Sequence, residues 1–328
     1  MRRRPAAPPS PLPQRLGVDP VRRRLPAADR GEDGGEDGGG WLTVRDYLRE
    51  LLPVDAESVD ALFEGDGPGD GVHGTDGRLT ADSPFVPEAW IWYHRDLPSE
   101  VEVPFPLTVV HRDERIVVAD KPHFLSIAPR GKHVTQTALA LLRHRLGLPE
   151  LSPAHRLDRL TAGLVLFVVR PQDRRAYQEL FAERRVRKEY RAVAPYRPGL
   201  ELPCTVENRL VKERTELTAR EVPGEANSRS VVELLTRDGR WGGYRLLPET
   251  GKTHQLRVHL AGLGIPIAND PLYPCVLPEQ APDDFRDPLQ LLAHTLEFTD
   301  PLTGSELRFE STRQLAHWPG RPASDPAL

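Results

Sequence analysis

The strongest constraint on the fold of this chain is a succession of short apolar segments between residues 104 and 320. Some have the length and β-branched content of strands, and others have the 3.6-residue apolar spacing of helices. The expected strands are RIVVAD (115–120), LVLFVVR (164–170), KEYRAVAPY (188–196), VVELLTR (231–237), GYRLLPE (243–249) and LLAHTLEF (291–298), and the expected helices begin at Thr135, Gln172 and Thr253. Because these elements do not alternate regularly, we predict an α+β domain with a mixed, mostly antiparallel sheet and packed helices.

The regions that flank this domain differ from it in composition. Residues 1–40 are rich in Pro, Arg, Gly and Asp and end in GEDGGEDGGG, which predicts a disordered tail. Residues 41–103 predict a small α/β-type unit, with short helices at TVRDYLRELL and VDALF and a strand at WIWYH. The Pro-rich VPFPL segment marks the boundary to residues 104–320, and residues 321–328 are expected to be a flexible C-terminal tail.

The distribution of charge bears on possible partners. The net charge of −4 alone would not favour a nucleic-acid partner. However, 44 residues are Lys or Arg, and the arginines cluster at 143–159, 170–191 and 209–220. Arginine offers planar stacking and bidentate phosphate contacts, although the nucleotide composition of a genome can produce the same bias. Both explanations remain open.

Other features limit the compartment and the cofactors. No run of about 18 apolar residues could span a bilayer, and the start MRRRP leads into prolines rather than a signal core. We therefore expect a cytoplasmic protein without a membrane partner, and a monomer by default. Cys204 and Cys275 lack a CxxC pattern or a nearby histidine, so neither a disulfide framework nor a zinc site is expected.

One acidic residue stands out at the entry to a predicted strand. The segment HRLDRLTAGLVLFV places Asp158 beside His155, Arg156 and Arg159 on a polar turn. Neighbouring cations stabilise an ionised carboxylate, so we expect Asp158 to be charged. Two interpretations remain, a carboxylate with a catalytic role or an ordinary turn residue ahead of a strand.

A second polar segment, ETGKTHQLRVHL, gathers His254, Gln255, Arg257 and His259 at a predicted helix start. The histidines are five residues apart without an HExxH pattern, so no metal site is expected. The helix start could accept a phosphate on its free N–H groups, or Thr253 could simply cap the helix. Arg257 lies between apolar neighbours, so we expect it to be partly buried and ion-paired.

A third segment, RRVRKEYRAV, surrounds Tyr190 with Arg187, Lys188 and Arg191 at the entry of a strand. Basic residues around an aromatic ring suit single-stranded RNA, where a base stacks on the ring for roughly 1 to 3 kcal/mol. A tyrosine that packs in the core is the alternative interpretation.

In their order along the chain, the three segments resemble the motifs of the RluA-type pseudouridine synthases over residues 105–310. HRLDRLTAG resembles that family's HRLD-x-x-T-S-G segment, and KEY resembles its K-x-Y segment. TGKTHQLRVHL with GIPIANDPLY resembles TGRTHQIRVHL and G-x-P-x-x-GD-x-x-Y, and DERIVVADKPHFLSIAP resembles a strand followed by a K-P-x-G-L turn. The resemblance implies the pseudouridine synthase fold and an isomerisation of uridine in ribosomal or transfer RNA that needs no cofactor. Residues 41–103 faintly resemble the alpha-L RNA-binding motif.

The resemblance also implies roles for single residues. It makes Asp158 the catalytic carboxylate, Arg257 its partner, and Tyr190 the ring that stacks on the target base and helps to remove its C5 proton. The expected RNA contacts are His155, Arg156, Arg159, Lys188, Lys252, His254 and Gln255. The departures from the family pattern are Ala162 for Ser, Lys252 for Arg, His123 near a glycine turn, and Asn269 and Pro274 where glycine is usual.

Two other functions remain open at this point. An RNA-binding protein without activity would use the same arginines. A glycoside hydrolase would need a second carboxylate, for which Glu189 and Glu249 are the candidates.

Overall fold

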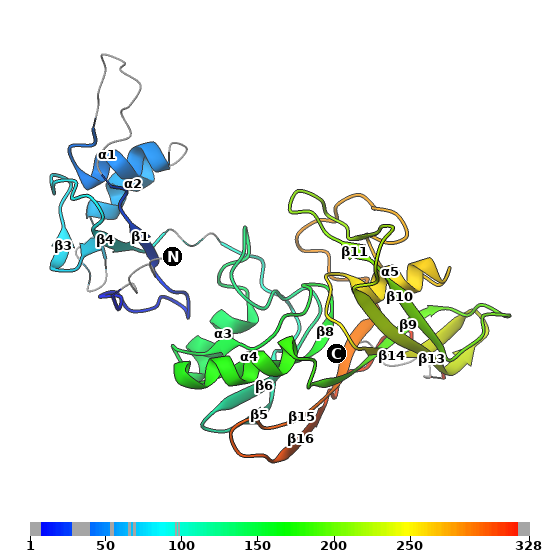
Figure 1. The fold of residues 1–328 in the computed structure, drawn as a ribbon. Helices are drawn as coiled ribbons and strands as arrows, with labels where there is room; N and C mark the ends of the chain where they lie inside the picture. The colour runs from blue at the N-terminus through cyan, green and yellow to red at the C-terminus, as the bar shows by residue number, and fades with distance from the viewer. Residues whose placement is uncertain are drawn as a thin grey trace. The chain divides into compact units, whose positions relative to one another are not determined.

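The computed structural model describes residues 8–27, 40–52, 56–64, 67, 70–95, 97 and 99–320. The predicted C-terminal tail and part of the predicted N-terminal tail lie outside these residues. The chain divides into two compact units, Met1–Ser99 and Glu100–Leu328, where the sequence had predicted a boundary between residues 103 and 104 (Figure 1). No helix within the described ranges is both long and apolar enough to cross a membrane.

The N-terminal unit contains an antiparallel sheet in the order β1-β4-β2-β3 and two helices. Its elements are β1 (Val21–Arg24), α1 (Val44–Leu51), α2 (Ala56–Glu64), β2 (Val72–Gly74), β3 (Gly77–Leu79) and β4 (Trp90–Tyr93). The two predicted helices and the WIWYH strand are thus confirmed. Helix α1 begins after Thr43 because Thr43 and Asp46 form a capping box.

Strand β1 contradicts the prediction of a disordered tail for part of residues 1–40. Val21–Arg24 pairs with β4 through four residues. The buried side chains Leu12, Val18 and Leu25 anchor this segment. Composition alone missed them, because three scattered apolar residues in a Pro- and Arg-rich stretch give no period of their own.

The C-terminal unit is built on a ten-stranded sheet whose main path runs β10-β13-β14-β9-β15-β8-β6-β5. Its strands are β5 (Thr108–Arg112), β6 (Ile116–Lys121), β7 (Ser152–Pro153), β8 (Ala162–Val168), β9 (Arg187–Pro195), β10 (Cys204–Asn208), β13 (Ser228–Asp238), β14 (Trp241–Pro248), β15 (Leu291–Thr299) and β16 (Glu306–Glu310), while β11 (Leu210–Val211) and β12 (Arg220–Glu221) form a separate pair. Only the β8–β15 pair is parallel among the pairs of this sheet. The predicted α+β class with a mixed, mostly antiparallel sheet is confirmed.

Three helices cover this sheet: α3 (Ala138–Leu146), α4 (Arg174–Ala182) and α5 (Gln255–Gly262). A 3₁₀ turn, Pro171–Asp173, precedes α4. The predicted start of α3 at Thr135 is three residues early, because the Thr137 hydroxyl accepts the Ala140 N–H and caps the helix. Gly147 ends α3 in the left-handed conformation, which glycine adopts without strain.

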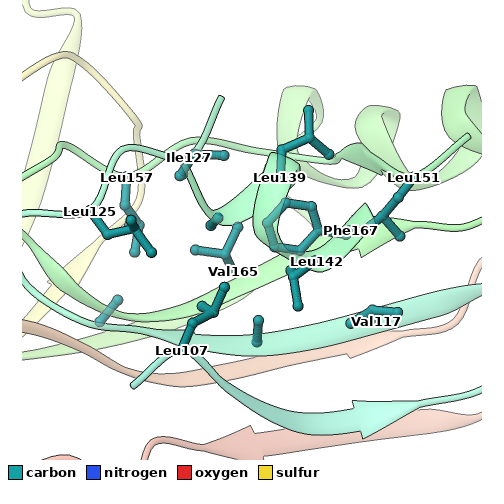
Figure 2. Close-up of a cluster of buried hydrophobic side chains, with 13 residues drawn as sticks. Leu107, Val117, Leu125, Ile127, Leu139, Leu142, Leu151, Leu157, Val165 and Phe167 are labelled. Atoms are coloured by element: carbon teal, nitrogen blue, oxygen red, sulfur yellow. The ribbon is translucent and has the colours of Figure 1, made fainter. Parts of the chain in front are cut away.

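The alternation of side chains along β6 and β8 places α3 and α4 on opposite faces. Leu139 and Leu142 of α3 pack with Val117 and Phe167 in one cluster, which Figure 2 shows. Tyr177 and Leu180 of α4 pack with Ile116 and Leu166 in another cluster, and α5 covers β9 and β14. Strands β6 and β8 are buried on both faces and therefore fix the ends of the loops that adjoin them.

Gly163 lies in β8 where that strand meets β15, just after the loop that carries Asp158. Its φ is +116°, and a Cβ atom there would lie 2.6 Å from the Ala293 nitrogen. We expect Gly163→Ala to destabilise the protein by about 3 kcal/mol, because both the conformation and the space exclude a side chain. Gly262→Ala, in α5 with open space around it, is the matched control and should change stability by less than about 1 kcal/mol. Urea unfolding measures both, and equal effects would contradict this explanation.

Candidate active site

A pocket of about 410 Å³ opens in the C-terminal unit where four segments converge. Its walls come from the loop ahead of β8, the end of α4, the start of β9 and the loop ahead of α5. The volume lies within the ~300–1,000 Å³ usual for small-ligand sites, so the pocket has room for one nucleoside. Asp158, Tyr190 and Arg257, which lie far apart in the sequence, all line it.

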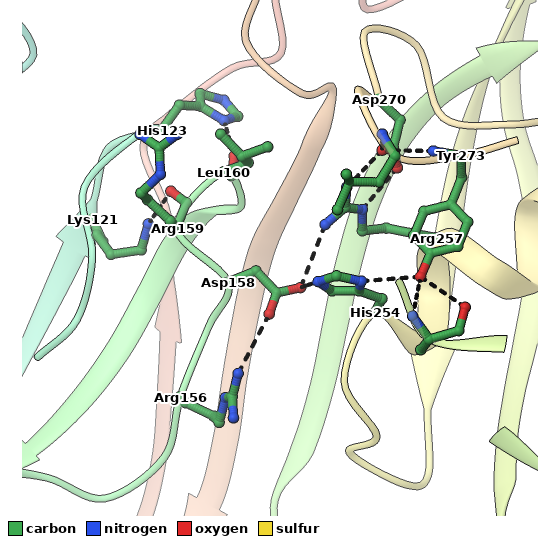
Figure 3. Close-up of polar contacts among 12 residues, drawn as sticks. Lys121, His123, Arg156, Asp158, Arg159, Leu160, His254, Arg257, Asp270 and Tyr273 are labelled. Atoms are coloured by element: carbon green, nitrogen blue, oxygen red, sulfur yellow. Dashed lines mark hydrogen bonds and ion pairs between the residues drawn. The ribbon is translucent and has the colours of Figure 1, made fainter. Parts of the chain in front are cut away.

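Asp158 lies in the pocket wall with 21% of its side chain exposed. Three cationic or potentially cationic groups surround its carboxylate: Arg156 Nη2 at 3.9 Å, His254 Nε2 at 3.8 Å and Arg257 Nη1 at 3.9 Å (Figure 3). None of these distances is a hydrogen bond. The oxygens therefore keep lone pairs for a substrate.

Arg257 is held by a second carboxylate. Its side chain is 2% exposed, and it donates from Nε and Nη2 to Asp270 Oδ2 and Oδ1 at 2.7 and 2.6 Å. This bidentate pair is the strongest geometry available to an arginine. The guanidinium also lies 5.3 Å from the centre of the Tyr273 ring. Asp270 thus fixes the plane of the guanidinium, so that Nη1 points at Asp158 (Figure 3).

His254 lies directly ahead of α5 in the left-handed conformation, with φ +57°. Its Nδ1 is 3.0 Å from the Tyr273 hydroxyl. Burial, opposed by the charge of Asp158 and reinforced by that of Arg257, lowers the pKa of His254 to about 4. The imidazole is therefore neutral at pH 7. Of the two interpretations of this helix start, capping by Thr253 is not observed, because His254 occupies the N-cap position and makes no side-chain cap.

Tyr190 of β9 lines the pocket together with Lys188. Burial and the charge of Asp158 both raise the pKa of Tyr190, so its hydroxyl keeps its proton at neutral pH. Glu189 and Arg191 alternate with these residues and point to the other face of the sheet, where they lie 3.8 Å apart. The site therefore has a phenol donor beside the carboxylate, not a second base.

The two carboxylates considered for a glycoside hydrolase lie in different settings. Glu189 is on the sheet face away from the pocket, 3.9 Å from His294. Glu249 lines the pocket but accepts a 2.8 Å hydrogen bond from Arg229. Neither is presented as the free acid that paired-carboxylate hydrolysis requires.

Some expected RNA contacts face the solvent. Arg156 and Lys252 are exposed at the pocket, and Lys188 is half-buried in its wall. Arg159 is exposed too, but it donates to the Phe124 carbonyl at 3.2 Å rather than lining the pocket. Arg156, Lys188 and Lys252 can therefore meet phosphates at the mouth of the pocket.

Two other expected contacts turn inward. His155 stacks on Phe181 and accepts the Leu166 N–H, and burial lowers its pKa to about 3. Gln255 is buried, and its amide bonds Thr250, the Lys252 N–H, Ser230 and the Arg229 carbonyl. These polar groups are used to shape the loops that line the pocket. They offer no charge to a phosphate.

Sequence reasoning missed three residues of this region. Asp270 and Tyr273 lie in the ANDPLYP segment, of which only Asn269 and Pro274 were considered. The acid that follows the apolar IPIA stretch was an available signal for Asp270. Lys121 at the end of β6 is fully buried, and it donates to the Pro122 and Arg159 carbonyls at 3.0 and 3.3 Å. Burial lowers the pKa of Lys121 to about 7. The available sequence signal for Lys121 was its position at the end of an apolar strand that is buried on both faces.

The structure shows the backbone conformation or contacts of two residues that depart from the family pattern, Asn269 and His123. Asn269 adopts φ +60°, a conformation that asparagine tolerates where glycine is usual. In the turn after β6 it is Phe124, with φ +65°, that takes the left-handed conformation, while His123 bonds the Leu160 carbonyl at 2.7 Å. Among the residues described, no group of three or more His, Cys, Asp and Glu side chains is arranged to hold a metal ion.

Comparisons with known proteins identify similar sequences and a similar fold. The family model for RNA pseudouridylate synthase matches residues 115–262. The dual-specificity RNA pseudouridine synthase RluA of Pasteurella multocida is 32% identical over 219 residues, which are 62% of this chain and 92% of that protein. The mitochondrial tRNA pseudouridine(32) synthase of Saccharomyces cerevisiae is 34% identical over 172 residues, 51% of this chain and 37% of that protein.

The chain spans only 31% to 37% of the length of the yeast, mouse and human relatives it matches. A solved structure, human RNA pseudouridylate synthase domain containing 4, aligns with a TM-score of 0.50 at 24% identity. The alignment covers 64% of this chain and 88% of that one. This likeness shows that the two share a fold.

Proposed function

Because the chain belongs to the RluA-type pseudouridine synthase family, we propose that it isomerises specific uridines in structured RNA to pseudouridine. The observation that carries the proposal is the carboxylate of Asp158, free to contact a substrate and flanked by Arg257, in a pocket with room for one nucleoside. Asp158, Tyr190 and Arg257 are the proposed catalytic residues.

The reaction breaks the N1–C1′ bond, turns the uracil and joins C5 to C1′, without net oxidation. Positive charge develops on the sugar as the bond breaks, and an ionised carboxylate beside C1′ stabilises it. Asp158 then either attacks C1′ or removes a proton from C2′, and both routes need the same placement. Arg257, itself oriented by Asp270, holds the Asp158 carboxylate directed at the sugar.

In this proposal, the Tyr190 ring stacks on the uracil and its hydroxyl donates a hydrogen bond. Its raised pKa argues against the expectation that it removes the C5 proton, because a phenol that stays protonated is a poor base. We expect Tyr190→Phe to keep stacking and lose about tenfold in rate, whereas Tyr190→Ala should lose on the order of 10²-fold or more. Single-turnover rates test this, and equal rates for all three proteins would remove Tyr190 from the site.

The proposed partner is RNA with an unpaired or weakly paired target. The target base must leave its stack, which costs a few kcal/mol unless it is already unpaired, so loops and bulges are the favoured substrates. Arg156, Lys188 and Lys252 are placed to contact the flanking phosphates. The monomeric state and the cytoplasmic location stay predictions, and the name of the yeast relative gives that protein a mitochondrial location.

The names of the relatives suggest transfer RNA position 32 and large-subunit ribosomal RNA as first substrates to test. Purified protein is incubated with unmodified transcripts of both, and pseudouridine is mapped at single-nucleotide resolution. The proposal expects conversion at one or a few uridines. RNA binding without any conversion would favour the alternative of a non-catalytic RNA-binding protein.

A further inference from the structure

The hydrogen bonds around Tyr273 determine the tautomer of His254. The Tyr273 hydroxyl accepts the Ala219 N–H at 2.7 Å and donates its single proton to the Ala219 carbonyl at 2.9 Å. The Ala219 carbonyl can only accept, and no other donor reaches it among the described residues, so it takes the hydroxyl proton. The Tyr273 oxygen then accepts from His254 Nδ1, which lies 3.0 Å away (Figure 3). Nδ1 carries the imidazole hydrogen, and Nε2 of the neutral ring carries a bare lone pair.

This lone pair faces the proposed catalytic carboxylate. His254 Nε2 and Asp158 Oδ2 are 3.8 Å apart, and both are acceptors. Among the described residues, no group donates a hydrogen bond to either atom. Two facing acceptors repel each other unless a hydrogen-bond donor lies between them. His254 Nε2 and Asp158 Oδ2 therefore need a donor from the substrate.

The nucleoside offers two donors, the N3–H of uracil and the 2′-hydroxyl of ribose. Asp158 must lie beside C1′ and C2′ in either route of the proposed reaction. The 2′-hydroxyl, attached to C2′, is then next to the carboxylate, whereas N3–H lies across the uracil ring from N1. We propose that His254 Nε2 accepts a hydrogen bond from the 2′-hydroxyl of the target uridine and thereby selects ribose over deoxyribose.

This inference rests on the proposed function, and it adds a specificity-determining residue to it. The 2′-hydroxyl is the group by which a protein distinguishes RNA from DNA at one nucleotide. As the sugar gains positive charge, the hydroxyl becomes a stronger donor, and hydrogen bonds to a 2-hydroxyl strengthen in related glycosyl transition states. His254 thus contributes to both recognition and rate.

Binding tests the inference without turnover. All proteins carry Asp158→Ala, and the probes are an RNA oligonucleotide containing the mapped uridine and the same oligonucleotide with 2′-deoxyuridine at that position alone. With His254 present, the ribose probe should bind about tenfold more tightly than the deoxy probe. His254→Leu should reduce this ratio to about one, and His254→Gln, which keeps an acceptor, should give an intermediate ratio.

A purely structural role for His254 would weaken both probes equally in His254→Leu and leave the ratio unchanged, which overturns the inference. Imidazole ¹⁵N shifts of the otherwise wild-type protein add a measurement that needs no RNA. They should show Nδ1 protonated and Nε2 bare at pH 7, and the reverse tautomer would overturn the inference. Absence of pseudouridine formation by the wild-type protein would instead count against the proposed function.

Discussion

Asp158→Asn is expected to lower the rate of pseudouridine formation by on the order of 10⁴-fold or more, because no other carboxylate without a hydrogen-bond partner lines the pocket among the described residues. The amide is nearly isosteric, so the pocket keeps its shape. It carries no charge, however, and can neither attack C1′ nor stabilise the positive charge on the sugar. Single-turnover assays with a mapped RNA substrate measure the rate.

RNA binding by Asp158→Asn should stay within about tenfold of the wild type, since exposed cations rather than Asp158 meet the phosphates. Asp238→Asn, at the exposed end of β13, is the matched control for removal of one negative charge and should keep its rate. Turnover by purified Asp158→Asn at more than a few per cent of the wild-type rate would contradict the assignment.

The second large effect is expected at the buried pair of Arg257 and Asp270. Arg257→Met or Asp270→Leu alone leaves an unpaired buried charge and should destabilise the protein by about 3 to 5 kcal/mol. The double variant removes both charges together, so its stability should return to near that of the wild type. Urea unfolding of the three variants measures this coupling.

Activity should not return with stability. In the double variant, Asp158 has lost the cation 3.9 Å from its Oδ2 atom, so we expect its rate to stay at least about 10²-fold below that of the wild type. A stable and fully active double variant would show that Arg257 only supports the fold. A double variant as unstable as the single variants would contradict the explanation that the instability comes from an unpaired buried charge.

The sequence predicted those elements whose signals are local. The apolar run of β8 and the Gly147 stop of α3 need no distant partner to be recognised. Strands β1 and β16 are short and depend on pairing with β4 and β15, because VRRR has no apolar period and the alternation of ELRFE rests on only two apolar residues. Propensity is local and pairing is not, which explains the missed strands.

The same distinction applies to the candidate site. Asp158, Tyr190 and Arg257 were predicted from motifs, and the structure brings all three to one pocket. Motifs did not reveal which way a polar side chain points. Gln255 was expected to face RNA but is used inside the protein, and Asp270 gained its importance only from its contact with Arg257.

The central claim is most directly tested with an RNA transcript that carries tritium at C5 of its uridines. Joining C5 to C1′ expels the C5 hydrogen, so each conversion releases one tritium to water while the base stays attached to the RNA. We predict release equal to the number of mapped sites with the wild-type protein and none with Asp158→Asn. Release of free uracil would instead indicate a glycoside hydrolase, and RNA binding without any tritium release would contradict the proposed isomerisation.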